Sequence, residues 1–444
     1  MKKLLIILVF SPFLGITQSS DISWDSFITI ADNTDGRPRI VLTSNNRPLI
    51  IWREGHSSKV LRASKWNGVN FSPPYDILSQ GIFPDSWDGP EIVAYGDTVY
   101  VVFTSAATLQ TSIMLIKSFD GGLTFSDTIR VSENNLNYKF RMGNVVVKED
   151  GNPIVSYMQY ALNWKDPKQM VNTSANLGSS FFGAVEGSQL APGEPCDCCK
   201  SSLISLENKL FLLFRNNYNN ERNSYITKSI DGGLSFISTV DMDDYDWLLN
   251  SCPATTPRGV VWGDSLVIVK RSGATGNNEI VCSSINITDL NYSYNNNIDP
   301  IQGIVQDYPE ISSSEDTIVV VWQDNRSGNQ NCYMSFSTNG PAYLNGSIPF
   351  TDSSYTGHKY DPDVEYAGGN IHLVYLDYTQ KKIIYIQGSF DLINHVNQLD
   401  FIRENVTIID VLGRKAKEKA NQLLFYIYDD GTVDKRIKIG RELF

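Results

Sequence analysis

The stretch that decides the fold is PEIVAYGDTVYVVFTS, at residues 90–105. It contains a short strand, a polar turn at Gly96 and Asp97, and a second strand rich in Val, Tyr and Phe. These are the signals of a β-hairpin. The pattern recurs along the chain at intervals of about 50 to 60 residues. Further copies begin at Pro38, Gly143, Ser201, Pro257, Pro309 and Pro362.

The interval between copies predicts the architecture. Each hairpin is followed by enough chain for two more strands, and four strands per repeat of about 50 residues is the pattern of a β-propeller. We therefore predict an all-β propeller, with seven blades preferred and six as the alternative. The last copy lacks a good fourth strand, and we expect the segment SWDSFITIADN at residues 23–33 to supply it and close the ring.

A second repeated element has the form Ser-x-Asp-x-Gly-x-x-Phe. Good copies are SFDGGLTF at 118–125 and SIDGGLSF at 229–236, and weaker ones are SKWNGVNF at 64–71 and SANLGSSF at 174–181. In such a turn the Asp accepts backbone N–H bonds, the Gly adopts positive φ, and the aromatic side chain packs beneath. These segments resemble the Asp-box of sialidase-like (BNR-repeat) propellers. The resemblance implies that fold, with these turns on the face away from the functional site.

The two ends of the chain predict export. Residues 1–18 have two lysines, an apolar run and then small and polar residues, as in a secretory signal peptide. From residue 405 the LGR turn and the stretch LLFYIYDDGTVDKRI resemble the C-terminal sorting domain read by the type IX secretion machinery. That resemblance implies a small β-sandwich-like tail and passage across the outer membrane. We divide the chain into a signal peptide at 1–18, a propeller at 20–390, a connector at 391–404 and a sorting domain at 405–444.

Composition excludes several classes of protein. With 41% hydrophobic and 19% charged residues, the chain is not intrinsically disordered. Its one long apolar run is at the N-terminus, which excludes a polytopic helical membrane protein and leaves no transmembrane segment in the mature chain. The net charge of −12 disfavours nucleic acid as a partner. The glycine-rich nucleotide-binding motifs and the G-x-S-x-G motif of serine hydrolases are absent.

The cysteines are confined to the middle of the chain. In an exported protein an even number favours disulfides, and pairing of Cys252 with Cys198 or Cys199 would join the entrances to blades four and five. The alternative is a thiolate metal site, because Cys196 and Cys199 have C-x-x-C spacing, but a second such pair or a nearby His is missing. We expect no metal and no cofactor. The disulfide candidates are Cys196, Cys198, Cys199, Cys252, Cys282 and Cys332.

Arg, Asp and Tyr gather at the strand ends that form one mouth of the propeller. Residues just before the first strands include Arg37, Arg39, Asp88, Lys200, Arg258, Asp307, Tyr308 and Asp361, and residues just after the second strands include Arg53, Arg215, Arg271, Asp324, Arg326 and Asp377. Surface charges at such positions are often merely solvated.

The sialidase resemblance implies a specific chemistry at this mouth. Three arginines would bind a carboxylate, because the planar guanidinium matches its geometry. A Tyr activated by a Glu would be the nucleophile, and an Asp the acid/base. The substrate-binding candidates are Arg53, Arg215, Arg271, Arg326 and Asp324, and the catalytic candidates are Asp88, Tyr308 and Glu310, with Tyr360 and Glu54 as an alternative pair.

One departure weakens the catalytic interpretation. The Phe-Arg-Ile-Pro motif of the sialidase family is absent, and Arg37-Pro38-Arg39-Ile40 stands in its place. We therefore expect an exported propeller that engages carbohydrate or a glycoconjugate at the cell surface or outside the cell, with non-catalytic binding favoured. The alternative is a glycoside hydrolase of the sialidase type.

Overall fold

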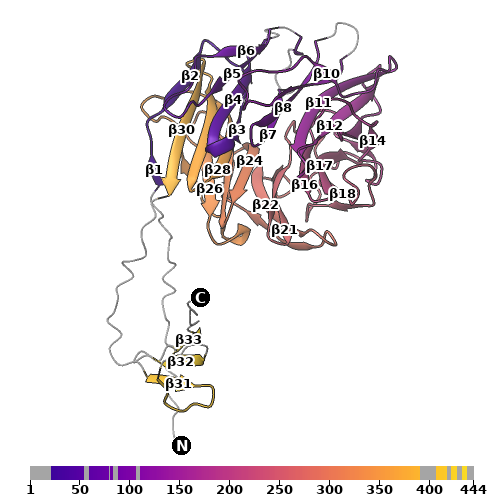
Figure 1. The fold of residues 1–444 in the computed structure, drawn as a ribbon. Coiled ribbons are helices and arrows are strands. Elements are labelled where there is room, and N and C mark those ends of the chain that lie inside the picture. The colour runs from indigo at the N-terminus through magenta and orange to yellow at the C-terminus, as the bar shows by residue number, and fades with distance from the viewer. Residues whose placement is uncertain are drawn as a thin grey trace, which may run out of the picture. The chain divides into compact units, whose positions relative to one another are not determined.

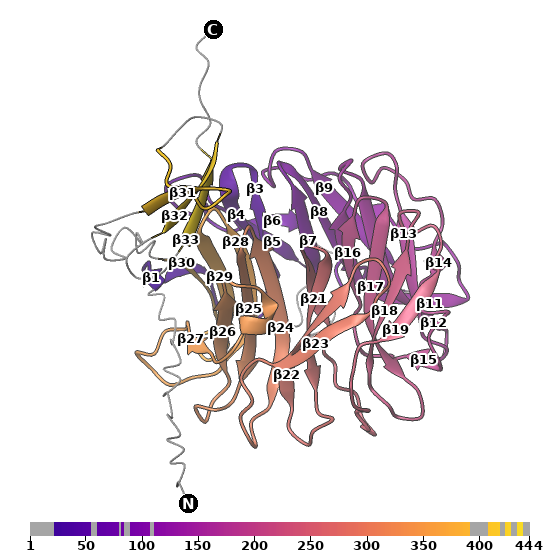
Figure 2. The same ribbon diagram turned by 90° about the horizontal axis from the view of Figure 1, so that it is seen from below.

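The computed structural model describes residues 22–54, 60–79, 81–83, 89–106, 111–390, 407–417, 422–427 and 433–437. The chain divides into two compact units, and Ser23–Ser389 forms one of them. This unit is built from seven antiparallel sheets, the blades of a β-propeller (Figure 1; Figure 2). The all-β propeller and the preferred count of seven blades are confirmed, and the six-bladed alternative is wrong.

Each blade has its first strand at the central channel and its fourth at the periphery. Blade one contains β3 (Pro38–Thr43), β4 (Arg47–Arg53), β5 (Leu61–Lys65) and β6 (Tyr75–Leu78), with the 3-10 helix η1 (Ser44–Asn46) in its first turn. Blade two contains β7 (Glu91–Tyr95), β8 (Thr98–Thr104), β9 (Ile113–Ser118) and β10 (Ile129–Arg130). Blade three contains β11 (Tyr138–Val147), β12 (Pro153–Ala161), β13 (Lys168–Thr173) and β14 (Val185–Glu186). Blade four contains β16 (Ser202–Leu206), β17 (Lys209–Asn217), β18 (Ser224–Ser229) and β19 (Ser238–Asp241), and β15 (Glu194–Pro195) also pairs with β17.

The remaining blades follow the same order. Blade five contains β20 (Arg258–Trp262), β21 (Ser265–Ser272), β22 (Glu279–Asn286) and β23 (Tyr292–Asn297). Blade six contains β24 (Gln306–Ser314), β25 (Thr317–Asp324), β26 (Asn331–Ser337) and β27 (Ile348–Pro349), with the 3-10 helix η2 (Pro341–Tyr343) before β27. Blade seven contains β28 (Lys359–Ala367), β29 (Asn370–Asp377) and β30 (Lys382–Phe390), completed by β2 (Ile28–Asp32) and β1 (Ile22–Trp24). No helix in these ranges is long and apolar enough to cross a membrane.

The chain's N-terminal strands close the ring, as the sequence predicted. Strand β2 runs antiparallel to β30, with Ile28 opposite Tyr385 and Thr29 opposite Ile384. Ile30 packs with Ile383 and Tyr385 in the apolar layer that also holds blade one. Blade seven is therefore completed by the segment at residues 23–33.

The packing between blades explains the apolar second strands. In β8, every residue from Val99 to Phe103 is buried. Successive side chains of a strand point to opposite faces, so Val99 and Val101 pack against blade one while Tyr100 and Val102 pack against blade three. A strand covered on both faces needs a continuous apolar run. The run VYVVF at residues 99–103 is thus typical of an interior strand of a blade.

The Ser-x-Asp-x-Gly turns have the expected geometry. Asp120 Oδ1 accepts the N–H groups of Leu123 and Thr124 at 2.9 Å, and Ser118 Oγ accepts the N–H of Gly122 at 2.9 Å. Gly122 has φ +90°, and a Cβ there would lie 2.5 Å from the Leu49 side chain, so any other residue would be strained. Although desolvation opposes ionisation, the hydrogen bonds from Ser118 and Thr124 lower the pKa of Asp120 to about 2. The turn at Asp231 repeats these bonds.

The described part of the tail forms one antiparallel sheet. Its strands are β31 (Thr407–Asp410), β32 (Leu423–Ile427) and β33 (Val433–Ile437). At the LGR turn the Arg414 guanidinium lies 2.8 Å from Asp410, and Gly413 has φ +76°. The predicted signal peptide and connector lie outside the described residues.

Candidate functional site

Repeated β-bulges shape the mouth of the channel. In β24, Tyr308 and Pro309 oppose one residue of β25, because the register shifts between Asp307 and Glu310. The same shift occurs in β28 around Asp361. Tyr308 has φ +51° and Asp361 has φ +52°, a backbone conformation that non-glycine residues rarely adopt. Such bulges re-aim side chains and occur often beside functional sites.

Below the mouth, the first strands enclose a polar cavity of about 220 Å³. Its wall carries charged side chains from blades one, two, five, six and seven. The position is the same in each of those blades: the residue that follows the proline of the hairpin motif. These residues are Arg39, Glu91, Arg258, Glu310 and Asp363.

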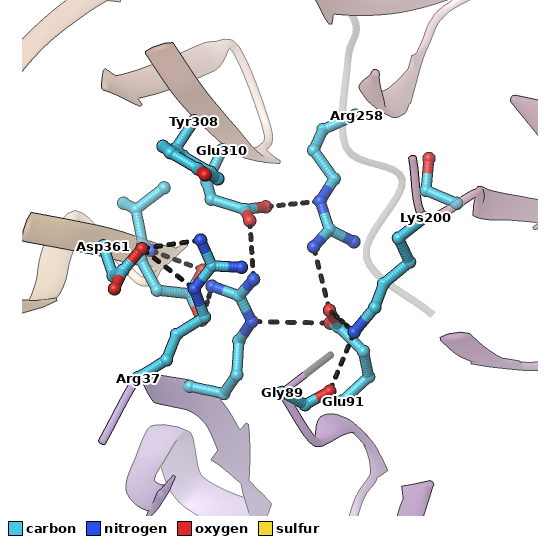
Figure 3. A network of polar contacts seen from close by, with 12 residues as sticks. Arg37, Gly89, Glu91, Lys200, Arg258, Tyr308, Glu310 and Asp361 are labelled. Atoms are coloured by element: carbon cyan, nitrogen blue, oxygen red, sulfur yellow. Dashed lines mark hydrogen bonds and ion pairs between the residues drawn. The ribbon is translucent and has the colours of Figure 1, made fainter. Parts of the chain in front are cut away.

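The charges inside the channel form one ion-pair network (Figure 3). Glu91 lies 3.0 Å from Lys200, 3.0 Å from Arg258 and 3.5 Å from Arg39. Glu310 lies 2.9 Å from Arg258 and 3.1 Å from Arg39. Each arginine therefore bridges two carboxylates contributed by different blades.

A second pair lies at the rim. The Arg37 guanidinium is 2.6 Å from Asp361 and sits 4.6 Å from the ring centre of Tyr308 (Figure 3). Burial raises the pKa of Tyr308, although Arg37 acts against that shift. The Tyr308 side chain is thus a neutral phenol at pH 7. Between these rim residues and Lys200 the remaining cavity is about 20 Å³, roughly the room for one water molecule.

The carboxyl groups of the channel differ in proton affinity. Burial alone would raise the pKa of Glu91, but Arg258, Arg39 and Lys200 hold it well below its usual range. Burial raises the pKa of Asp363 to about 7, because Arg39 offsets it only in part. Burial and the neighbouring Asp363 raise the pKa of Glu365 to about 8. Deep in the channel, the carboxyl groups of Asp363 and Glu365 are thus wholly or partly protonated at pH 7, and this protonation removes part of the negative charge.

Two predicted substrate-binding arginines surround Trp247. The Arg215 guanidinium lies 5.0 Å from the Trp247 ring centre and that of Arg271 lies 5.4 Å from it. Arg215 is fully buried and donates to the carbonyl of Arg222 and, at 2.7 Å, to that of Arg271. Arg271 pairs with Asp307 at 2.6 Å. Arg215 thus links blades four and five, and Arg271 links blades five and six.

The other predicted site residues fall in three places. Arg326 pairs with Asp324 at 2.5 Å and with Asp299 at 2.6 Å, within blade six and its preceding loop. Arg53 is buried at the end of β4, beside Gly36. Asp88 lies outside the described residues. Of the predicted catalytic residues, Tyr308 and Glu310 come together at the mouth, as do the arginines at 37, 39 and 258.

Sequence reasoning missed Glu91, Asp363 and Glu365 as residues of the channel. A signal was present for two of them, since three hairpin copies begin with Pro followed by an acid: Pro90-Glu91, Pro309-Glu310 and Pro362-Asp363. Two others begin with Pro-Arg, at Pro38 and Pro257.

One predicted disulfide is present, between Cys198 and Cys252. The other candidates are free thiols: Cys196, Cys199, Cys282 and Cys332. Cys282 and Cys332, both disulfide candidates, lie on third strands of adjacent blades but face different surroundings. Cys282 packs in the apolar layer between blades five and six, whereas the groups that act on Cys332 include Lys359 and Asp361 of blade seven.

No protein-family model matches the chain, and no curated protein matches it. Among solved structures, an ulvan lyase bound to -[GlcA(1-4)Rha3S]- is similar with a TM-score of 0.53 and 8% identity, over 81% of this chain and 95% of the lyase. The polysaccharide lyase Uly1 gives 0.51 and 9%, over 81% of this chain and 90% of that one. The Hadza microbial sialidase Hz136 gives 0.47 and 12%, over 64% of this chain, which spans only 62% of that sialidase. At these identities the similarity to the lyases shows a shared propeller fold.

The Glu91→Gln variant tests the network. Loss of this charge leaves three buried cations with one carboxylate fewer, so we expect the free energy of unfolding to fall by about 3 kcal/mol. Urea denaturation measures it. The matched control is Asp76→Asn, which removes an exposed partner of Arg62 2.9 Å away and should cost less than about 1 kcal/mol. Equal losses in the two variants would contradict the central role of Glu91.

Glu365 predicts a pH dependence of stability. Its pKa is raised to about 8 in the folded chain, so between pH 4.5 and 8 the folded chain binds more protons than the unfolded chain. The free energy of unfolding should therefore fall as pH rises through that window, by up to about 1.4 kcal/mol per pH unit for this one group. Glu365→Gln should flatten the slope. Glu207→Gln, at an exposed site with a lowered pKa, should leave the slope unchanged; an unaltered slope in Glu365→Gln would refute the assignment.

Proposed function

We propose that this protein is an exported propeller that binds carbohydrate or a glycoconjugate without cleaving it. One observation carries the proposal: the mouth is already occupied by its own side chains. Arg37, Arg39, Lys200 and Arg258 each contact a carboxylate of the same chain, and the space between them is about 20 Å³. A sugar ring has no room there.

The same pairing argues against the chemistry of an exo-sialidase. Binding of a substrate carboxylate requires arginines whose donors are not already committed to carboxylates. Arg39 and Arg258 each bridge Glu91 and Glu310, and breaking a buried pair is costly. Glu91, with its lowered pKa, is also unsuited to donate a proton at neutral pH.

An aromatic cluster at the rim of blade seven offers a better surface for a sugar. The rings of His358 and Tyr360 are stacked with centroids 5.8 Å apart, and Tyr378 packs edge-on against Tyr360 at 5.5 Å. Tyr378 lies in the connection between β29 and β30, on the same face as the mouth, and is 42% exposed. Ligand sites combine such apolar faces with a few polar groups, and a tyrosine supplies both at low entropic cost.

Carbohydrate as the ligand class also draws on the fold. The propellers with TM-scores above 0.5 carry the names of polysaccharide lyases. A fold does not determine a function, so this similarity supports the ligand class and not a reaction.

A second candidate function is a glycoside hydrolase of the sialidase type. The observation that favours it is the left-handed backbone at Tyr308, which turns a phenol toward Arg37 beside Glu310. In that reading Tyr308 is the nucleophile, Glu310 its activating base and Asp88 the acid/base. The phenol would need that base, because its pKa is raised.

A glycan panel, neutral and sialylated, distinguishes the two functions when bound and released sugar are measured together. We expect binding without release, and a loss of affinity of about tenfold in Tyr378→Ala, which removes one aromatic face. The control is Tyr343→Ala, 62% exposed on the opposite face, which should bind as wild type. Release that disappears in Tyr308→Phe would instead establish the hydrolase. Neither binding nor release across the panel would refute both.

We further propose that residues 1–18 are a signal peptide, that the Asp120 and Asp231 turns are Asp-boxes, and that residues 405–444 address the chain to the type IX secretion machinery. The basis is the sequence pattern alone. We expect the protein in the culture medium or at the cell surface to lack residues 405–444, as intact mass spectrometry would measure. Retention inside the cell of a chain with both ends intact would overturn the export proposal.

A further inference from the structure

Four cysteines form a compact cluster at the entrances to blades four and five. The sulfur atoms of Cys196, Cys198, Cys199 and Cys252 all lie within 4.8 Å of one another. Three come from the loop between β15 and β16, and Cys252 comes from the loop that precedes β20. The proposed carbohydrate binding makes no use of them.

The cluster consists of a disulfide in contact with a dithiol. Cys198 and Cys252 are bonded, and Cys252 is exposed. Cys196 and Cys199 are fully buried, and their sulfur atoms are 3.2 Å apart. The Cys196 sulfur is 3.5 Å from that of Cys198, close to the separation at which a nucleophile attacks.

The surroundings favour one thiol as the nucleophile. The hydrogen bond from Cys199 lowers the pKa of Cys196 to about 7; burial opposes this, and Arg222, whose Nη1 lies 3.6 Å from the sulfur, and Arg215 assist it. Burial and the same hydrogen bond raise the pKa of Cys199. The thiolate is the reactive form of cysteine, so Cys196 attacks and Cys199 keeps its proton until later.

We propose that the cluster is a thiol–disulfide exchange centre that moves a disulfide from Cys198–Cys252 to Cys196–Cys199. The Cys196 thiolate attacks the Cys198 sulfur, the Cys196–Cys198 bond forms, and the electron pair of the old bond leaves on Cys252. Cys199 then loses its proton to water and attacks the Cys196 sulfur, and the electron pair leaves on Cys198. One disulfide and two thiols are present at the start and at the end, so no external oxidant or reductant is consumed.

The exchange has a structural consequence. The Cys198–Cys252 bond joins the loop before β16 to the loop before β20, and Ala254 and Thr256 of the latter loop line the mouth beside Arg258. After exchange this cross-link is gone, and Cys198 and Cys252 present an accessible dithiol. An external disulfide, on a protein or a small molecule, is the chemical class that such a pair would reduce.

Disulfide mapping of the full-length chain, purified without reductant, tests the proposal. The native protein is incubated with N-ethylmaleimide at pH 8, quenched in acid and mapped by peptide mass spectrometry. We expect Cys252 to become alkylated while a Cys196–Cys199 disulfide accumulates. A Cys252 that stays fully bonded to Cys198 would overturn the proposal. So would four reduced cysteines with one bound zinc per chain, because four thiolates are also a zinc ligand set.

Two variants and a control locate the nucleophile. Cys196→Ser should lower the rate of Cys252 alkylation by at least about tenfold, since the attacking thiolate is lost. In Cys199→Ser the first step should still release Cys252, but the exchange should stop at a Cys196–Cys198 disulfide. This variant also identifies Cys196 as the nucleophile if Cys196→Ser does not fold. Cys332→Ser, a buried free thiol elsewhere, should behave as wild type. Unchanged alkylation of Cys252 in a folded Cys196→Ser chain would contradict the mechanism. Glycan binding is measured separately, so failure of either proposal leaves the other testable.

Discussion

The propeller depends on the neutralisation of charge along its axis. Five of the seven first strands place a charged residue after the hairpin proline, and in the narrow channel these charges pair with one another and with Lys200. Arg39 and Arg258 must each bridge Glu91 and Glu310, which ties blades one, two, five and six together across the axis. Since a buried charge without a partner is far more costly than a buried pair is favourable, loss of one member of the network would destabilise the contact between these blades. It also fills the place where a ligand would otherwise enter.

Most of the fold was predictable because a propeller repeats. Seven copies of a strand, a turn and an apolar strand, at one spacing, leave little freedom for any other architecture. The segment around Ile28 was predictable as the closing strand because the last copy lacked a partner. The cysteine pairs were only partly predictable: the sequence separates Cys252 from Cys198 by a whole blade, and nothing in it tells which blade interface Cys282 or Cys332 faces.

The site was predictable as a region but not as a set of contacts. Strand ends tell which residues reach the mouth, and Tyr308 and Glu310 do reach it. The positions of the strand ends do not tell whether a guanidinium points to solvent or to a carbonyl. Arg215 was predicted to bind a ligand, but its guanidinium donates hydrogen bonds to two backbone carbonyls. The β-bulges at Tyr308 and Asp361 could not be predicted from the sequence either. Each is one extra residue relative to the neighbouring strand, and it becomes visible only when the pairing of the two strands is known.

The closure of blade seven by β2 has a consequence for the order of assembly. Strand β2 has no partner until β30 has been synthesised, so the ring cannot close before residue 390 is added, at about 5–20 residues per second. Until then β2 is an unpaired edge and blade seven lacks its outer strands. Contacts so distant along the chain make folding slow. A chain with this connectivity therefore acquires its closed, rigid ring only after its last blade has been made.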